Sequence, residues 1–158
     1  MILHDRIRLI GRLLCRGLAA PGWKKTGWRV LLLLYAAVLF ALSSLPMSPG
    51  RPILGIPSGD KLVHAGEFAV FFLLASRALA GPGRRRVLLA FVLTSVYAGT
   101  DEFHQLFVAT RTASVLDWLA DLAGAGAAAL LTLGAFRSSL WRLRRLRILK
   151  GDNPDREG

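Results

Sequence analysis

The residues of this sequence that could do chemistry lie in two short polar clusters within otherwise apolar stretches. The first cluster, DKLVHAGEF at 60–68, places an acid, a lysine, a histidine and a second acid within two helical turns; these are Asp60, Lys61, His64 and Glu67. The second cluster spans 101–121 and contributes Asp101, Glu102, His104, Gln105, Arg111, Asp117 and Asp121. Imidazole and carboxylate groups suit general acid-base chemistry, whereas lysine and arginine suit the binding of phosphate or carboxylate.

Four apolar segments must position these clusters. They cover about 28–45, 62–80, 87–107 and 115–136. Each is close to the roughly 17–25 residues that a helix needs to cross the hydrocarbon of a bilayer. Backbone polar groups in lipid must be hydrogen-bonded within the protein, and none of the segments alternates polar and apolar residues as a barrel strand does. The sequence therefore predicts an all-α, polytopic membrane bundle of four transmembrane helices.

The basic residues indicate the orientation of this bundle. The net charge is +11, but lysine and arginine are gathered before the first span, in Arg84–Arg86 of the second connection, and after the last span. The first and third connections together hold only Arg51, Lys61 and Arg111. Because basic loops stay in the cytoplasm, we expect a multi-pass protein with both termini cytoplasmic. The same distribution explains the charge without a nucleic-acid partner.

The chain divides into three predicted regions. Residues 1–27 form a basic cytoplasmic leader, either an amphipathic helix on the inner leaflet or a solvated segment. Residues 28–136 form the membrane domain, and 137–158 form a basic juxtamembrane tail with a disordered end. The only cysteine is Cys15, so no disulfide within the chain is possible, and a cleaved signal peptide is not expected. The sequence predicts no oligomeric state.

Helix geometry brings the polar clusters to one depth. At about 1.5 Å per residue, His64, Asp101 and Asp121 each lie roughly 21–24 Å from the cytoplasmic boundary of their spans. On the third span Asp101, His104 and Gln105 share a face, while Glu102 points about 100° away. We therefore expect a polar pocket that opens to the outside of the membrane. A network that only locks the helices together remains an alternative.

The last span carries a stripe of small and polar residues. Its members follow one another at helical spacing: Ser114, Asp117, Asp121, Gly124 and Ala128. Small residues at four-residue spacing let another helix approach closely, so the polar face of this span should also be its packing face. Thr112 or Ser114 is expected to cap the start of the helix.

These two clusters resemble the VanZ-like membrane protein family. Asp60, Lys61 and His64 match an Asp-Lys-x-x-His segment, and Asp101, Glu102 and Gln105 match an Asp-Glu-x-x-Gln segment. An arginine, an acid opening the next helix and a glycine follow, at Arg111, Asp117 and Gly124. The chain departs from the family where Asp121 replaces a common asparagine and where Ala109-Thr110 replaces a Pro-Gly turn. The similarity covers about 28–136.

The resemblance implies an integral protein of the bacterial plasma (inner) membrane. The family takes its name from a protein associated with reduced sensitivity to the glycopeptide teicoplanin. The first functional hypothesis is a pocket that binds the head group of a membrane lipid or a cell-wall precursor, with Lys61 and Arg111 as anchors for an anion. A salt bridge from Arg111 to Asp101 or Asp117 is the structural alternative. Ten residues are candidates for ligand binding: Asp60, Lys61, His64, Glu67, Asp101, Glu102, Gln105, Arg111, Asp117 and Asp121.

Three further hypotheses remain open. The first is an intramembrane enzyme acting on a lipid-linked substrate, with His64, Asp101 and His104 as catalytic candidates. The second is a metal site, because HAGE and DEFH each place a histidine and an acid three residues apart, which resembles the Glu-x-x-His motif of metal-binding bundles. The order is reversed in one helix and an Asp replaces Glu in the other, so a hydrogen-bonded histidine is favoured and no metal or other cofactor is predicted. The third is a transporter, which a bundle of four helices without broken segments does not favour.

Overall fold

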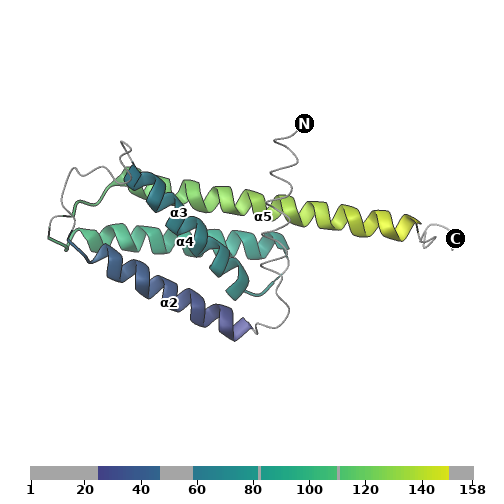
Figure 1. Ribbon diagram of the computed structural model, residues 1–158, viewed down its shortest axis with the longest axis horizontal. Helices are drawn as coiled ribbons and strands as arrows, with labels where there is room; N and C mark the ends of the chain where they lie inside the picture. The colour runs from purple at the N-terminus through teal and green to yellow at the C-terminus, as the bar shows by residue number, and fades with distance from the viewer. Residues whose placement is uncertain (1–24, 47–58, 82, 110, 150–158) are drawn as a thin grey trace. The chain divides into compact units, whose positions relative to one another are not determined.

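The computed structural model describes residues 25–46, 59–81, 83–109 and 111–149, with nothing to be said of the side chains of 139–149. Every regular element in these ranges is an α-helix, which confirms the all-α prediction (Figure 1). The helices are α2 (Lys25–Ser43), α3 (Gly59–Ala78), α4 (Gly83–Gln105) and α5 (Val115–Leu149). The predicted leader, apart from its last residues, and the predicted disordered end lie outside the described residues.

The helix boundaries follow local sequence signals. Between α3 and α4, Gly81 adopts a φ of 126°, a conformation that glycine tolerates best. The short link reverses the chain, so α3 and α4 run antiparallel and pack against each other. At the start of α5 the Ser114 hydroxyl accepts a hydrogen bond from the Asp117 N–H at 3.3 Å, which confirms Ser114 as a helix cap.

Two of the described helices are long and apolar enough to cross a membrane. They are Lys25–Ser43 and the part of α5 at Val115–Ser138. The other two expected spans, in α3 and α4, form helices of 20 and 23 residues that carry more charged groups. Large apolar side chains are exposed on all four helices, among them Leu33, Val70, Val96 and Leu130. The structure therefore supports a helical membrane protein and leaves the four-span topology as a proposal.

A group of aromatic residues joins three of the helices. The rings of Phe71 on α3 and Tyr97 on α4 stack with centroids 4.6 Å apart. The Tyr97 hydroxyl donates to the Ala36 carbonyl of α2 at 2.6 Å, and the Tyr35 hydroxyl donates to the Glu67 carbonyl of α3 at 3.1 Å. These contacts fix α2, α3 and α4 relative to one another, and so they help to position the polar side chains that α3 and α4 carry.

The chain falls into two compact units. Residues 21–130 form one unit, which contains α2, α3, α4 and the first part of α5. The other unit comprises Met1–Ala20 and Leu131–Gly158, of which the structure describes helical residues 131–149. Every residue of the site described below belongs to the first unit.

Candidate functional site

The centre of the site is a pair of side chains from α3 and α5. The His64 ring nitrogen Nδ1 lies 3.1 Å from Asp121 Oδ1. The Asp121 side chain is only 1% exposed, whereas His64 is 15% exposed. Beside this pair, Gly124 lies directly against the backbone of Ala65, and a Cβ atom there would come within 2.6 Å of the Ala65 carbonyl carbon. The close approach of the two helices is therefore what allows His64 to reach Asp121.

Helix α4 contributes two buried acids and an amide. The Gln105 amide donates to Asp101 Oδ2 at 3.2 Å and to Glu102 Oε1 at 3.4 Å. Glu102 Oε2 accepts a hydrogen bond of 2.8 Å from the Ser114 N–H, which belongs to the first turn before α5. Because one carboxylate is bonded to groups at both ends of the α4–α5 connection, Glu102 links the two helices.

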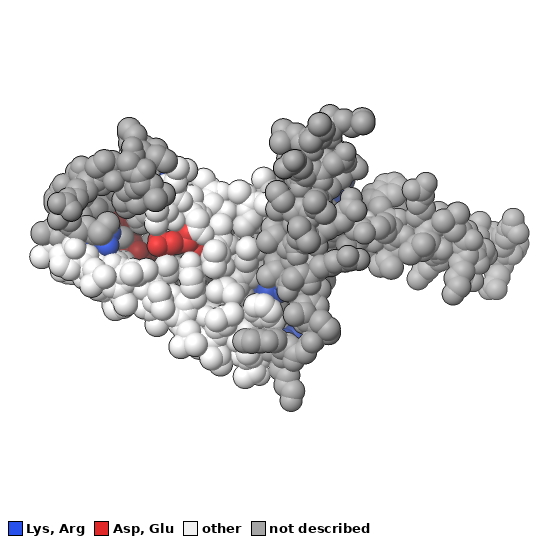
Figure 2. Space-filling model, in the orientation of Figure 1, with Lys and Arg blue, Asp and Glu red and all other residues white. Residues whose placement is uncertain are grey.

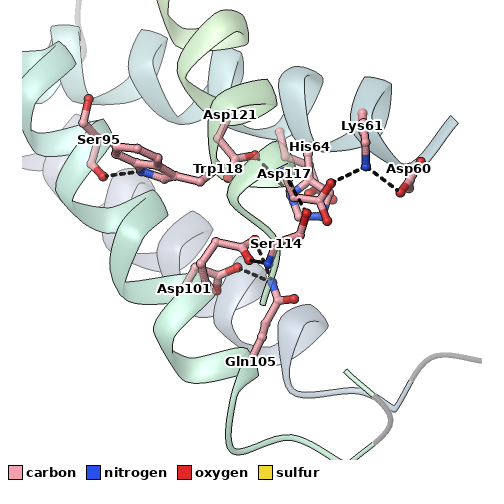
Figure 3. A network of polar contacts seen from close by, with 12 residues as sticks. Asp60, Lys61, His64, Ser95, Asp101, Gln105, Ser114, Asp117, Trp118 and Asp121 are labelled. Atoms are coloured by element: carbon pink, nitrogen blue, oxygen red, sulfur yellow. Dashed lines mark hydrogen bonds and ion pairs between the residues drawn. The ribbon is translucent and has the colours of Figure 1, made fainter. Parts of the chain in front are cut away.

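A lysine lies at the exposed end of the site (Figure 3). Lys61 Nζ donates to Asp117 Oδ1 at 2.7 Å and is 3.3 Å from Asp60 Oδ2. Side-chain exposure falls along this row, from 48% at Asp60 and 33% at Lys61 to 16% at Asp117, before the buried Asp121. Lys61 precedes the predicted span at 62–80, and its hydrogen bond with Asp117 raises the pKa of the lysine above the usual value. The row thus leads from a charged, accessible lysine to a buried carboxylate.

The buried end of the site brings together groups that could hold a cation. One ligand atom each from His64, Glu102 and Asp121 lie within 4.8 Å of one another. Two buried carboxylate oxygens nearby, Asp121 Oδ2 and Asp101 Oδ1, have no hydrogen-bond partner among the described residues. The metal hypothesis drawn from the sequence paired different residues, joining each histidine to the acid on its own helix. The structure joins one residue from each of three helices instead.

Two of the predicted site residues make contacts away from these acids. His104 Nε2 lies 3.0 Å from the Ser44 hydroxyl, and its ring lies 4.3 Å from the Phe40 ring at the end of α2. Arg111 donates through Nε and Nη2 to the carbonyls of Leu45 and Leu42, at 3.1 and 3.0 Å. Arg111 therefore binds the carboxyl-terminal end of α2 rather than a carboxylate of Asp101 or Asp117.

The face predicted for the third span is divided in the structure. Asp101 and Gln105 are buried together as expected, but Glu102 is buried beside them and His104 turns towards α2. On an ideal helix Glu102 points about 100° from Asp101, yet both side chains are buried. The reason is that α4 is flanked by α2 on one side and α3 and α5 on the other, so residues about 100° apart can both face protein. Glu67 is half-buried on α3.

The acidic residues are visible on one face of the molecule (Figure 2). They form a short row within a largely uncharged surface, and a basic side chain lies at one end of the row.

The comparison with protein-family models gave a match to VanZ/LLP1 over residues 23–138. The chain belongs to the VanZ/LLP1 family. The resemblance stated from the two polar clusters is therefore confirmed. The comparisons with curated proteins and with solved structures gave no match.

The VanZ/LLP1 region contains both helices that could cross a membrane and every residue of the site. Sequence reasoning placed Asp117, Asp121 and Gly124 on one face of the last helix, and their contacts with Lys61, His64 and Ala65 confirm this face. It missed the bond between Glu102 and the Ser114 N–H. No sequence signal could reveal that bond, because it depends on how the nine-residue connection after α4 folds back.

Proposed function

We propose that all four helices cross the bacterial plasma membrane and that both termini are cytoplasmic. Helices of 20 and 23 residues are about 30 and 35 Å long, enough to span the hydrocarbon. Exposed apolar side chains such as Leu62, Leu88 and Val96 would face lipid. The charged side chains Lys61 and His64 of α3 instead contact acids of α5. The arginines in the first turn of α4 favour a cytoplasmic position for the turn that precedes them, so the site would lie near the outer surface.

We further propose that the site binds the polar head group of a membrane lipid or a lipid-linked cell-wall precursor. The observation that carries this proposal is the row from Lys61 to Asp121, in which a partly exposed cation gives way to buried acids. The lysine has three N–H donors, two of which its contacts with Asp60 and Asp117 occupy, so a phosphate oxygen could take the third. Arg111 is the weaker anchor, because two of its donors already bind α2 carbonyls.

A binding measurement tests this proposal. Purified protein in detergent would be mixed with short-chain phosphatidylethanolamine or with a polyprenyl phosphate, and bound lipid would be counted by native mass spectrometry. We expect Lys61→Met to lower occupancy by roughly tenfold, as for a lost charge-assisted hydrogen bond. The matched control is Lys25→Met, which removes an exposed lysine at the start of α2. Equal occupancy in the wild type and Lys61→Met would contradict the proposal.

A role in glycopeptide susceptibility would follow if the bound molecule were a cell-wall precursor. Cells that carry the wild type or Lys61→Met at equal membrane levels would then differ in their sensitivity to teicoplanin. If lipid binding changes and sensitivity does not, the ligand is a membrane lipid and the link to the antibiotic fails.

A second candidate function is an intramembrane enzyme that acts on a lipid-linked substrate. The hydrogen bond between His64 and Asp121 favours it, because a carboxylate that orients an imidazole is a common arrangement for a general base. His104 is less suited, since its ring contacts Ser44 and Phe40. Release of phosphate from a polyprenyl pyrophosphate would be lost in His64→Gln and retained in His104→Gln. Absence of turnover in the wild type would leave the binding role alone.

A further inference from the structure

We propose that His64, Glu102 and Asp121 together bind one divalent transition-metal ion. The three side chains come from α3, α4 and α5, and one ligand atom from each lies within 4.8 Å of the others. Ligand atoms around one small cation lie roughly 3–3.5 Å apart, because each is about 2 Å from the ion. Small side-chain rotations would bring this set to that spacing, which the 3.1 Å between His64 Nδ1 and Asp121 Oδ1 already meets.

The negative charge of Glu102 and Asp121 at the buried end of the site favours the binding of a cation. Among the described residues, Glu102 is bonded to the Ser114 N–H and the Gln105 amide, neither of which carries a charge. Asp121 is bonded only to His64 through Oδ1, and its buried Oδ2 has no partner there. A buried carboxylate oxygen without a partner is costly, and a second carboxylate within 4.8 Å of it adds repulsion between like charges. A divalent ion would neutralise the negative charge of both carboxylates, and Asp121 Oδ2 would bind the ion.

The protein already holds the three side chains in place. The contact between Gly124 and the Ala65 backbone lies next to His64 and less than one turn from Asp121, so it fixes the distance between the two helices. The Ser114 N–H and the Gln105 amide both orient Glu102. Carboxylates that bind metals are usually held by such hydrogen bonds, and those bonds contribute strongly to affinity.

The ligand set indicates the type of metal. One imidazole with two carboxylates suits Zn²⁺ or Mn²⁺ better than Mg²⁺ or Ca²⁺, which prefer sites made of oxygen alone. Three protein ligands leave a coordination position open, as in metal sites that bind a further molecule. The row from Asp60 to Asp117 is the more exposed end of the site, so an incoming phosphate would meet Lys61 first. The metal site does not depend on the head-group proposal, since a metal could serve structure alone.

Metal analysis of the intact protein tests this inference. The chain would be produced without a polyhistidine tag, purified in detergent and analysed by mass spectrometry of its metals. After treatment with EDTA, Zn²⁺ or Mn²⁺ would be added alone. We expect about one equivalent of one of these metals per chain, and a rise in the unfolding temperature when it is restored. Mg²⁺ at the same concentration should have no effect.

Matched variants assign the metal to this site. His64→Gln, Glu102→Gln and Asp121→Asn should each lower the metal content by roughly tenfold or more. His104→Gln removes the neighbouring histidine by the same substitution and should keep the metal. Equal content in His64→Gln and His104→Gln would mean an adventitious ion only and would overturn the assignment. So would a wild type that neither contains nor responds to either metal.

A direct measurement on the wild type covers the case in which the variants aggregate. The X-ray absorption spectrum of the Zn²⁺- or Mn²⁺-loaded protein should show about one imidazole and otherwise oxygen ligands. A spectrum without imidazole, or with several, would contradict the site. Lys61→Met separates this inference from the head-group proposal, because it should lose lipid and keep the metal. If His64→Gln loses the metal and still binds lipid, the metal site is likewise separate from head-group binding.

Discussion

Gly124 of α5 lies against the backbone carbonyl of Ala65 in α3, and this contact sets the distance across which His64 meets Asp121. The two helices approach closely because glycine has no side chain at the point of contact. The close approach therefore belongs to the site as much as to the packing of the bundle.

Substitution at Gly124 should damage both stability and the site. In Gly124→Ala the new Cβ would lie 2.6 Å from the Ala65 carbonyl carbon, so the helices must move apart. We expect the free energy of unfolding to fall by about 1–3 kcal/mol, as for other overpacked contacts. Thermal unfolding in detergent measures this. The control is Gly66→Ala, where no atom lies within 4 Å and stability should be unchanged or slightly higher. Equal effects of the two substitutions would refute the packing role.

The proposed topology predicts which positions can be labelled from outside the cell. In a chain with Cys15 replaced by serine, Thr112→Cys should react with a membrane-impermeant maleimide in intact cells, whereas Arg84→Cys should not. Both positions are exposed, so accessibility within the protein does not limit either reaction. After the membrane is permeabilised, both should react. Labelling of Arg84→Cys in intact cells would reverse the proposed orientation.

The ion pair between Lys61 and Asp117 should make a small contribution to stability. A double-mutant cycle with Lys61→Met and Asp117→Asn is expected to give a coupling on the order of 0.5–1 kcal/mol, because Lys61 is 33% exposed and solvent screens the pair. Its hydrogen bond with Asp117 raises the pKa of Lys61 in the folded state, so the coupling is complete below the usual lysine range and is lost as the pH rises above it. A coupling that disappears near neutral pH would contradict this assignment.

Arg111 should act on stability through α2. Arg111→Ala removes two hydrogen bonds to the carbonyls of Leu42 and Leu45, and we expect the free energy of unfolding to fall by about 1–2 kcal/mol. Arg111→Lys should recover only part of this loss, because an ammonium group cannot reproduce the spread of the guanidinium donors. Arg84→Ala, at an exposed position, is the control for lost charge. A fully stable Arg111→Ala that no longer binds phosphatidylethanolamine would show instead that Arg111 anchors the ligand.

The sequence could predict the helices and the packing face of the last helix because both leave periodic signals. Apolar length indicated the helices, and helical spacing placed Asp117, Asp121 and Gly124 on one face. Ser114 could be recognised as a cap because its hydroxyl acts on a neighbour three residues away. Such features depend only on residues that are close together in the sequence, so the sequence alone can predict them.

The partners of those residues depend on how the helices pack, and here the sequence was insufficient. Helical angles separated Glu102 from Asp101, yet both are buried because α4 has protein on more than one side. Arg111 was expected to bind the anion of a ligand or a carboxylate of Asp101 or Asp117, but it binds carbonyls at the end of α2 that no charge pattern reveals. The grouping of His64, Glu102 and Asp121 likewise follows from three helix rotations that local spacing does not determine.

The hydrogen bond between Glu102 and the Ser114 N–H has a consequence for the connection that runs from 106 to 113. Because this hydrogen bond joins the two ends of the connection, the residues between them contribute little to holding α4 and α5 together. Lengthening a surface loop costs only a fraction of a kcal/mol for each modest insertion, roughly 0.6 kcal/mol for a doubling. Apart from Arg111, which binds the end of α2, this segment should therefore tolerate short insertions without disturbing the helices on either side.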